Sequence, residues 1–233
     1  SEALLCDSEA MEDDVTLAEA YALKTPEDNR DLYGRWAATY DATFVEGHGY
    51  AYPDNIAAAY LRSGGPTDLV LDVGCGTGLV GAALRERGVR VVHGLDISGA
   101  MLDQASLKRN VDGTKVYASL EEADLTQPTS IVGEYPGIVS AGTFTHGHLG
   151  PDSLDLVLGM ATSGGLLVIG VNSDLYNHEG GFGQWLESAG TEGRIVDAST
   201  VTVDIYANGS ATAQDHELDV DNTSGTVMIF RKA

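Results

Sequence analysis

Three glycines at alternate positions, Gly74, Gly76 and Gly78, constrain this chain more than any other feature of its sequence. They follow the apolar segment 69–73 and precede a segment with the apolar spacing of a helix. Glycine lacks a Cβ atom, so the backbone between a strand and a helix can turn sharply there and approach a ligand closely. The first N–H groups of the following helix are free to bind that ligand. The segment 70–78 therefore predicts a binding loop for a nucleotide-like cofactor.

The spacing of the glycines separates two kinds of cofactor. The loop reads Gly-x-Gly-x-Gly, whereas a dinucleotide-binding loop reads Gly-x-Gly-x-x-Gly, and position 79 is leucine. Asp72 would repel a pyrophosphate group but suits the cationic ammonium of a methionine. Asp96 ends the apolar segment 91–95, where a carboxylate can accept hydrogen bonds from both hydroxyls of a ribose. These residues favour S-adenosylmethionine over NAD; a structural turn with a helix-capping acid is the alternative.

Strands and helices alternate after residue 65. We expect strands at 69–73, 89–95, 115–118, 137–142 and 166–171. Helices are expected at about 78–87, after Ser98 and after Pro151. Continuous apolar strands separated by helices predict a parallel sheet with helices on both faces. A helix at 182–189 precedes strands at 194–206 and 225–231 with a turn at Asn208-Gly209, which predicts an antiparallel C-terminal edge.

The first 64 residues have the spacing of helices. An acidic stretch to Asp14 is followed by a predicted helix over 15–24. Thr25-Pro26 predicts the start of a second helix, with threonine as cap and proline in the first turn. One face of this helix carries large apolar and aromatic residues: Leu32, Tyr33, Trp36, Ala37 and Tyr40. A third helix follows the loop 46–53 and ends before the Gly-Gly-Pro segment 64–66.

Charge limits the partners of this chain. It has 13 Lys and Arg residues against 35 Asp and Glu residues, a formal net charge of -22, so its surface would repel nucleic acid. This acidity suits either a solvated surface adapted to salt or a patch that attracts a cationic substrate. No apolar run approaches the roughly 18–20 residues of a membrane span, and the first residues lack the basic character of a signal peptide. With only Cys6 and Cys75, we expect no disulfide framework and a cytoplasmic location.

Beyond the glycine loop, the sequence resembles class I S-adenosylmethionine-dependent methyltransferases. Within them it is similar to the methyltransferase-like group that includes the protein of the Williams–Beuren syndrome chromosome region. The resemblance extends over about 31–187 and is carried by the segments 33–41, 49–53, 94–102, 140–151 and 164–172. It implies a Rossmann-like α/β fold with a mostly parallel seven-stranded sheet, helices on both faces, an antiparallel C-terminal edge and an N-terminal helical lid. Two positions depart from the family pattern, namely 135–137 and 162–165.

The resemblance also implies the cofactor, S-adenosylmethionine, and the residues that would hold it. The methionine half would lie against the glycine loop, that is Asp72, Gly74, Cys75, Gly76 and Gly78. Asp96 would hold the ribose, with Ile97 and Met101 beside the adenine. Asp124 and Leu125 are the best match to the acid and backbone group that face the adenine amino group. A solvated loop acid is the alternative for Asp124.

Candidates for the chemistry follow the predicted fourth strand. The carboxyl ends of the first and fourth strands should border the reacting methyl group, which places Thr143, His146 and His148 near it. We take His146 as the candidate base or substrate ligand; the alternative is that it caps the next helix or binds a backbone carbonyl. His146 and His148 lack an obvious third ligand, so we expect no metal site.

The aromatic face of the second helix is the other candidate. Tyr33, Trp36 and Tyr40 could form a lid whose rings contact the sulfonium by cation–π attraction, with Tyr50 and Tyr52 completing it. The alternative is an ordinary apolar stripe that packs against the core.

We therefore expect one methyltransferase domain over 1–233, with N-terminal helices and lid at 1–64, a cofactor-binding core at 65–172 and closing elements at 173–233. It would transfer a methyl group to a small molecule by in-line displacement, leaving S-adenosylhomocysteine. The alternatives are another S-adenosylmethionine-dependent chemistry (lyase, cyclase or decarboxylase), a non-catalytic cofactor-binding protein, and a nicotinamide-dependent oxidoreductase, which the glycine spacing disfavours. The sequence names neither the acceptor atom nor the oligomeric state.

Overall fold

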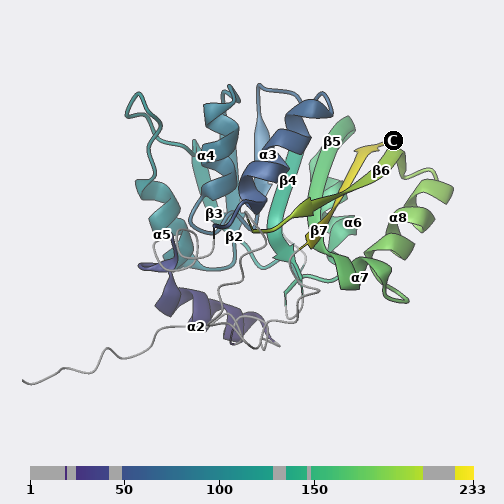
Figure 1. The fold of residues 1–233 in the computed structure, drawn as a ribbon, viewed down its shortest axis with the longest axis horizontal. Helices are drawn as coiled ribbons and strands as arrows, with labels where there is room; N and C mark the ends of the chain where they lie inside the picture. The colour runs from purple at the N-terminus through teal and green to yellow at the C-terminus, as the bar shows by residue number, and fades with distance from the viewer. Residues whose placement is uncertain (1–18, 20–24, 42–48, 128–134, 146–147, 207–223) are drawn as a thin grey trace, which may run out of the picture.

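Seven strands form one sheet in the order β3-β2-β1-β4-β5-β7-β6 (Figure 1). The computed structural model describes residues 19, 25–41, 49–127, 135–145, 148–206 and 224–233. The strands are β1 (Val70–Val73), β2 (Val92–Asp96), β3 (Ser119–Glu122), β4 (Tyr135–Phe144), β5 (Ala161–Asn172), β6 (Ile195–Asp204) and β7 (Ser224–Lys232). The described helices with bounds are α2 (Pro26–Trp36), α3 (Tyr52–Arg62), α4 (Leu79–Glu86), α5 (Gly99–Leu107), α6 (Ser153–Met160), α7 (Ser173–Asn177) and α8 (Phe182–Thr191).

The strand directions confirm the predicted fold class. β1 pairs in parallel with β2 and β4, β2 with β3, and β4 with β5. β7 then lies antiparallel between β5 and β6, which closes the C-terminal edge as expected. Parallel neighbours bring the carboxyl ends of β1, β2 and β4 to the same edge of the sheet, where ligands of open α/β sheets bind.

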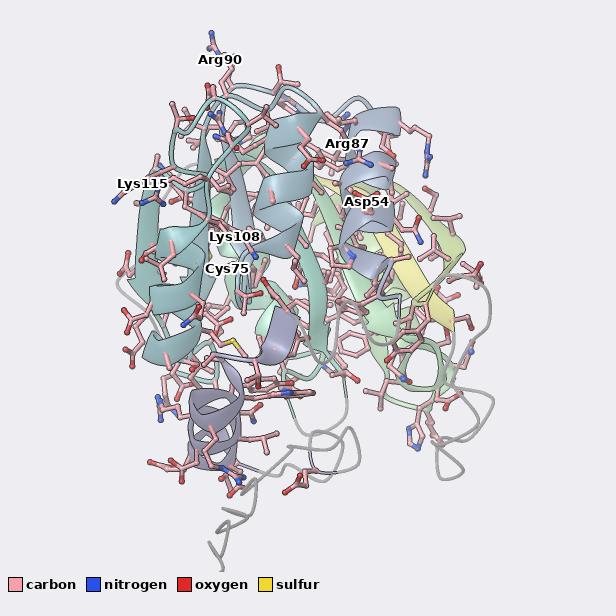
Figure 2. The ribbon with its side chains drawn as sticks, turned by 60° about the vertical axis from the view of Figure 1, so that its left-hand side comes forward. Asp54, Cys75, Arg87, Arg90, Lys108 and Lys115 are labelled. Carbon is pink, nitrogen blue, oxygen red and sulfur yellow. The ribbon has the colours of Figure 1, made fainter. Side chains whose placement is uncertain are left out.

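Helices cover both faces of the sheet because the strand side chains alternate in direction. Val70 and Val92 point to one face, where they pack in a core with residues of α3, α4 and α5. Leu71 and Ile169 point to the other face, where α6 and α8 supply the covering side chains. The ion pair between Arg87 and Asp54, at 3.0 Å, joins α4 to α3 at the surface (Figure 2). Among the described residues, every helix is too short or too polar to span a lipid bilayer.

The third strand corrects the sequence prediction. It lies at Ser119–Glu122 and not at 115–118, because Val116 and Tyr117 are buried in the core beneath α4 and α5 and do not enter the sheet. Ala118 begins the approach to β2, donating from its backbone N–H to the Val92 carbonyl at 2.9 Å. β3 is an edge strand with exposed side chains, so it needs no apolar pattern.

Other boundaries agree with the prediction to within a few residues, and one helix was not predicted. α7 (Ser173–Asn177) begins where the Asn172 side chain accepts hydrogen bonds from the N–H groups of Asp174 and Leu175. The predicted helix over 15–24, apart from the helical Glu19, and the turn at 208–209 lie outside the described residues.

α2 lies below the sheet in Figure 1 and begins as predicted. Thr25 accepts a hydrogen bond from the Asp28 N–H at 3.1 Å, and the Asp28 carboxylate accepts one from the Thr25 N–H at 2.9 Å. This reciprocal cap satisfies two donors at the helix start. The helix ends at Trp36, and a turn carries the chain on to Tyr40.

Candidate active site

A cavity of about 310 Å³ lies at the carboxyl ends of β1, β2 and β4 and is bordered by α2. Its size is within the range of small-ligand sites. Twelve of the residues predicted for the site line it: Tyr33, Trp36, Tyr40, Gly74, Cys75, Gly76, Asp96, Ile97, Met101, Leu125, Thr143 and His148. Three others, Asp72, Gly78 and Asp124, are described but do not line it. His146, the predicted base, lies outside the described residues.

The glycine loop leaves β1 in a backbone conformation that favours glycine. Gly74, Gly76 and Gly78 have φ angles of 67°, 52° and 94°, in the left-handed region. A Cβ atom on Gly74 would lie 1.8 Å from the Oγ1 atom of Thr143. The Thr143 hydroxyl in turn donates to the Val73 carbonyl at 3.2 Å. Glycine at position 74 therefore allows the end of β4 to lie directly against the loop.

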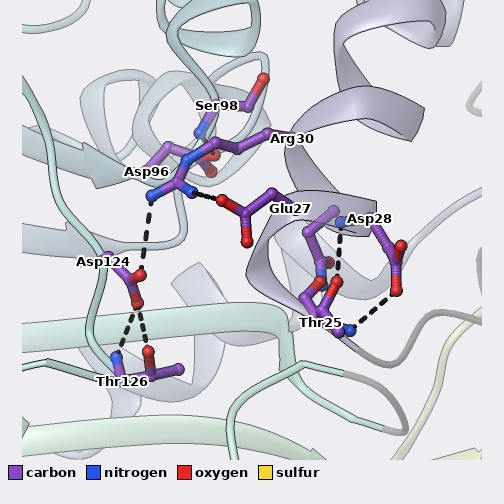
Figure 3. A network of polar contacts seen from close by, with 9 residues as sticks. Thr25, Glu27, Asp28, Arg30, Asp96, Ser98, Asp124 and Thr126 are labelled. Carbon is purple, nitrogen blue, oxygen red and sulfur yellow. Dashed lines mark hydrogen bonds and ion pairs between the residues drawn. The ribbon is translucent and has the colours of Figure 1, made fainter.

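Asp96 is held at the end of β2 by the loops on either side. One carboxylate oxygen accepts the Gly76 N–H at 2.8 Å. The other accepts the N–H of Ser98, which Figure 3 shows beside Asp96, at 2.9 Å. Burial raises the pKa of Asp96 above its ordinary value, while the backbone hydrogen bonds oppose this rise. A carboxylate has about four acceptor positions, so two remain for a ligand. Asp96 thus lines the cavity in a fixed orientation with acceptor capacity left over.

Asp72 takes a different place from the one expected. Its carboxylate is fully buried and accepts a hydrogen bond from the Tyr117 hydroxyl at 2.7 Å, and the same hydroxyl accepts the Gly81 N–H at 3.2 Å. Burial raises the pKa of Asp72 to about 7. Its second oxygen has no hydrogen-bond partner among the described residues. Asp72 therefore contacts the start of α4 through Tyr117, in the core below the glycine loop, and does not line the cavity.

Asp124 connects the cavity rim to α2. One of its oxygens accepts the N–H and hydroxyl of Thr126, at 2.9 and 2.6 Å. The other lies 3.6 Å from the Arg30 guanidinium, which also approaches Glu27 within its own helix (Figure 3). The neighbouring Leu125 is buried and lines the cavity.

A second contact joins the N-terminal region to the glycine loop. Thr77 donates its hydroxyl to one oxygen of Asp41 at 2.6 Å, and Lys108 of the α5 C-terminus pairs with the other oxygen. Arg30 and Asp41 therefore connect the N-terminal region to the loop of Asp124 and to the glycine loop.

Aromatic side chains of α2 and of the turn that follows it line the cavity together with the glycine loop. The ring of Tyr33 lies 6.1 Å from that of Trp36 and 6.4 Å from that of Tyr40, and the Trp36 and Tyr40 rings meet edge-on at 4.8 Å. Tyr50 extends the cluster toward Tyr206, 5.9 Å away. The predicted aromatic face thus borders the cavity and also forms a small core of its own.

Sequence reasoning missed the C-terminal contribution to this cluster. Ile205 and Tyr206 follow β6 and line the cavity. The Ile205 carbonyl accepts the N–H groups of Ala51 and Tyr52, at 2.9 and 3.1 Å, which brings the two segments together. The sequence of residues 194–206 predicted only a strand, and no local pattern indicated that Tyr206 would line the cavity.

His148 is the described histidine of the cavity. Its Nε2 atom lies 3.2 Å from the Tyr33 hydroxyl, and the two ring centroids are 5.7 Å apart. The turn that holds it is closed by the His148 N–H donating to the Thr145 carbonyl at 3.1 Å. Among the described residues, no group of three or more His, Cys, Asp or Glu side chains could hold a metal ion.

Comparison with known proteins gives a family match over the part of the chain that contains the glycine loop and Asp96. Residues 70–162 match a family described as "Methyltransferase domain". Human methyltransferase-like protein 27 is 43% identical over 81 residues, which cover 32% of this chain and 31% of that protein. The chain thus spans about a third of the length of this curated relative.

Two solved structures illustrate the likeness of the fold. Magnesium protoporphyrin IX methyltransferase from Synechocystis PCC 6803, solved with bound S-adenosylhomocysteine, has a TM-score of 0.60 at 19% identity, covering 89% of this chain and 99% of that one. The [4+2]-cyclase SpnF has a TM-score of 0.63 at 14% identity, covering 90% and 97%. Residues 70–162 therefore match a methyltransferase domain family, and the sheet that contains them has the Rossmann-like fold of these solved structures.

Proposed function

We propose that this protein transfers a methyl group from S-adenosylmethionine to a small-molecule acceptor. The observation that carries the proposal is that one cavity is lined both by the glycine loop with Asp96 and by aromatic and histidine side chains. We call the first set of residues the cofactor side, because it is suited to a cofactor, and the second set the acceptor side, because it offers room and polar groups for an acceptor.

The residues of the cofactor side fit S-adenosylmethionine. Asp96 has acceptor positions free for the two ribose hydroxyls, and Ile97, Met101 and Leu125 provide an apolar slot for the adenine. The glycine loop allows the backbone to approach the methionine half without obstruction. Bound there, the cofactor would supply a methyl group activated by its sulfonium.

The acceptor side favours a small molecule. Residues of α2 and of the segment at 205–206 line the cavity, and its volume of about 310 Å³ is that of a small-ligand site. The net charge of -22 opposes binding of nucleic acid. His146, the candidate base from the sequence, lies outside the described residues, and His148 is the described histidine that lines the cavity.

Calorimetry with S-adenosylmethionine, S-adenosylhomocysteine and NAD tests the cofactor. We expect the first two to bind and NAD not to bind; the opposite result would sink the proposal. Incubation with methyl-labelled donor and a metabolite extract then tests the reaction, because transfer yields S-adenosylhomocysteine together with a labelled product.

The similarity of the fold to that of a cyclase supports a second candidate function, an S-adenosylmethionine-binding enzyme that does not transfer the methyl group. An enzyme that rearranges its substrate would bind S-adenosylmethionine without consuming it, and a lyase would release methylthioadenosine. Detection of either behaviour, with no labelled acceptor, would replace methyl transfer as the function. A scaffold would bind the cofactor with no turnover in any extract.

A further inference from the structure

We propose that the methyl acceptor is an amine, and that His148, positioned by Tyr33, accepts its proton. This inference rests on the proposed methyl transfer and specifies the substrate class of the same cavity.

The charges of the cavity lining argue against an anionic acceptor. Among the described residues that line the cavity, none is a lysine or an arginine. Asp96 is the one carboxylate among them, and backbone N–H groups already bind both of its oxygens. A phosphate or carboxylate on the acceptor would therefore lose its hydration without gaining an opposite charge. The acceptor should be neutral or cationic.

The aromatic lining of the cavity favours a cationic acceptor over a neutral one. Six tyrosine and tryptophan side chains line the cavity: Tyr33, Trp36, Tyr40, Tyr50, Tyr52 and Tyr206. Aromatic faces attract alkylammonium groups, and the attraction grows when the site excludes water. The net charge of -22 adds a negative field that raises the local concentration of cations. Both effects select a protonated amine from solution and also stabilise a methylated, cationic product.

His148 is placed where a proton must be removed. It follows the end of β4, where the Leu149 N–H donates to the Thr143 carbonyl at 3.2 Å. Thr143 in turn contacts the glycine loop at the Val73 carbonyl. The histidine thus borders the junction of the methionine half and the aromatic cluster, within hydrogen-bond distance of Tyr33.

The other titratable groups of the lining are poorly suited to this role. Burial raises the pKa of Tyr40 well above its ordinary value of 10. This phenol therefore stays protonated at neutral pH and does not act as a base. Asp96 accepts one backbone N–H on each oxygen, and its remaining acceptor positions are those proposed for the ribose hydroxyls. An imidazole titrates near neutral pH and can accept a proton at Nδ1 while its Nε2–H donates to the Tyr33 hydroxyl, which keeps the ring oriented.

The proposed transfer begins with loss of a proton from the acceptor. Its ammonium form gives one proton to Nδ1 of His148, which frees the lone pair of the acceptor nitrogen. That lone pair forms the new bond to the methyl carbon while the carbon–sulfur bond breaks and leaves its electron pair on sulfur. The products are a methylated ammonium, a neutral thioether and an imidazolium that returns its proton to solvent.

Calorimetry with matched probes tests the aromatic site in the full chain saturated with S-adenosylhomocysteine. The probes are choline, its neutral carbon analogue 3,3-dimethylbutan-1-ol and the anion 3,3-dimethylbutanoate. We expect choline to bind at least about fivefold more tightly than the alcohol, and the anion to bind most weakly. Equal or tighter binding of the alcohol or the anion would overturn the proposal.

Variants of Tyr33 separate the ring from its hydroxyl. Tyr33→Leu should remove the preference for choline, whereas Tyr33→Phe should keep it. Tyr135→Leu is the matched control, because Tyr135 pairs with His93 outside the cavity lining at 3.1 Å. A preference that survives Tyr33→Leu, or that is lost equally in the Tyr135 control, would contradict the aromatic role.

Turnover tests the proton step with amine acceptors found by the labelled-donor screen. His148→Ala should lower turnover about a hundredfold at neutral pH without changing cofactor affinity, and activity should recover as the pH passes the pKa of the acceptor amine. Tyr33→Phe should lower kcat with little change in KM, and His93→Ala should leave both unchanged. Methylation of oxygen or sulfur by an active enzyme overturns this inference alone, whereas cofactor binding without any methyl transfer overturns the proposed function too.

Discussion

The two sides of the cavity are built in different ways. The cofactor side comes from one continuous stretch, from β1 to Leu125, in which backbone N–H groups of Gly76 and Ser98 fix Asp96. The acceptor side is assembled from segments far apart in the chain, which meet where the Ile205 carbonyl accepts the N–H groups of Ala51 and Tyr52. The cofactor side depends on hydrogen bonds of the backbone, and the acceptor side depends on packing of rings.

This difference tells us where each side can vary. A backbone site tolerates few substitutions, because each one changes the path of the chain. A site of packed rings can change its shape through single side chains while the sheet stays intact. One cofactor side combined with an adaptable acceptor side would allow the same fold to serve different substrates.

Gly74→Ala should give the largest effect, since Gly74 lies where the two sides meet. The new Cβ would lie 1.8 Å from Thr143 Oγ1, and the backbone has a φ of 67°. We expect calorimetry to detect no binding of S-adenosylmethionine and thermal unfolding to show a clear loss of stability.

Gly113→Ala is the matched control for this change. Gly113 has a φ of 80° but no atom within 4 Å of the position of its Cβ. It should cost only the strain of a left-handed residue, about 1–2 kcal/mol, and leave binding intact. Equal effects of the two changes would show that strain and not contact makes Gly74 necessary.

The same difference explains what could be predicted from the sequence. The glycine loop and Asp96 were predictable because their order along the chain fixes their order around the cofactor. Tyr206 was not predictable, since its place depends on the return of β6 to Ala51. Asp72 was placed beside the ligand by motif reasoning, but Tyr117, 45 residues away in sequence, binds it in the core. A residue's type and spacing indicate proximity to a site, and tertiary packing decides which way its side chain faces.

The Asp72–Tyr117 pair predicts a pH dependence of stability on the cofactor side. The pKa of Asp72 is about 7 in the folded protein and near 3.8 in an unfolded chain, so between these values only the folded state holds the proton. The free energy of unfolding should therefore fall as pH rises from about 4 to about 7 and then level off. The contribution is up to about 4 kcal/mol.

Comparison with Asp72→Asn isolates this contribution, because the variant has no proton to lose at that position. Denaturant unfolding at several pH values should give a flatter profile for Asp72→Asn than for the native chain over this range. Parallel profiles would show that the carboxyl group is already ionised in the folded protein at pH 4.

Asp96→Ala should give an intermediate effect, confined to cofactor binding. The change removes acceptors for the ribose hydroxyls and also leaves two backbone N–H groups without their partner. We expect S-adenosylmethionine affinity to fall by about 1.5–3 kcal/mol, the cost of a lost hydrogen bond to a charged group. Calorimetry measures this change, and Asp103→Ala, on the exposed surface of α5, serves as its control. Unchanged affinity in a folded Asp96→Ala variant would refute the ribose role.

Arg30→Gln should give the smallest effect, because it tests the contact between the two sides and neither site itself. Arg30 and Asp124 lie 3.6 Å apart with side chains 37% and 22% exposed, so water and salt screen their attraction. We expect the contact to contribute about 0.2–1 kcal/mol to cofactor affinity at low salt and nothing measurable at high salt. A double-mutant cycle that combines Arg30→Gln with Asp124→Asn measures the coupling energy between the two residues. It subtracts the effect of each single substitution, including the loss of the hydrogen bonds between Asp124 and Thr126. A coupling energy that persists in high salt would mean that α2 and the adenine side form one rigid unit, and the two sides of the cavity could then no longer vary independently.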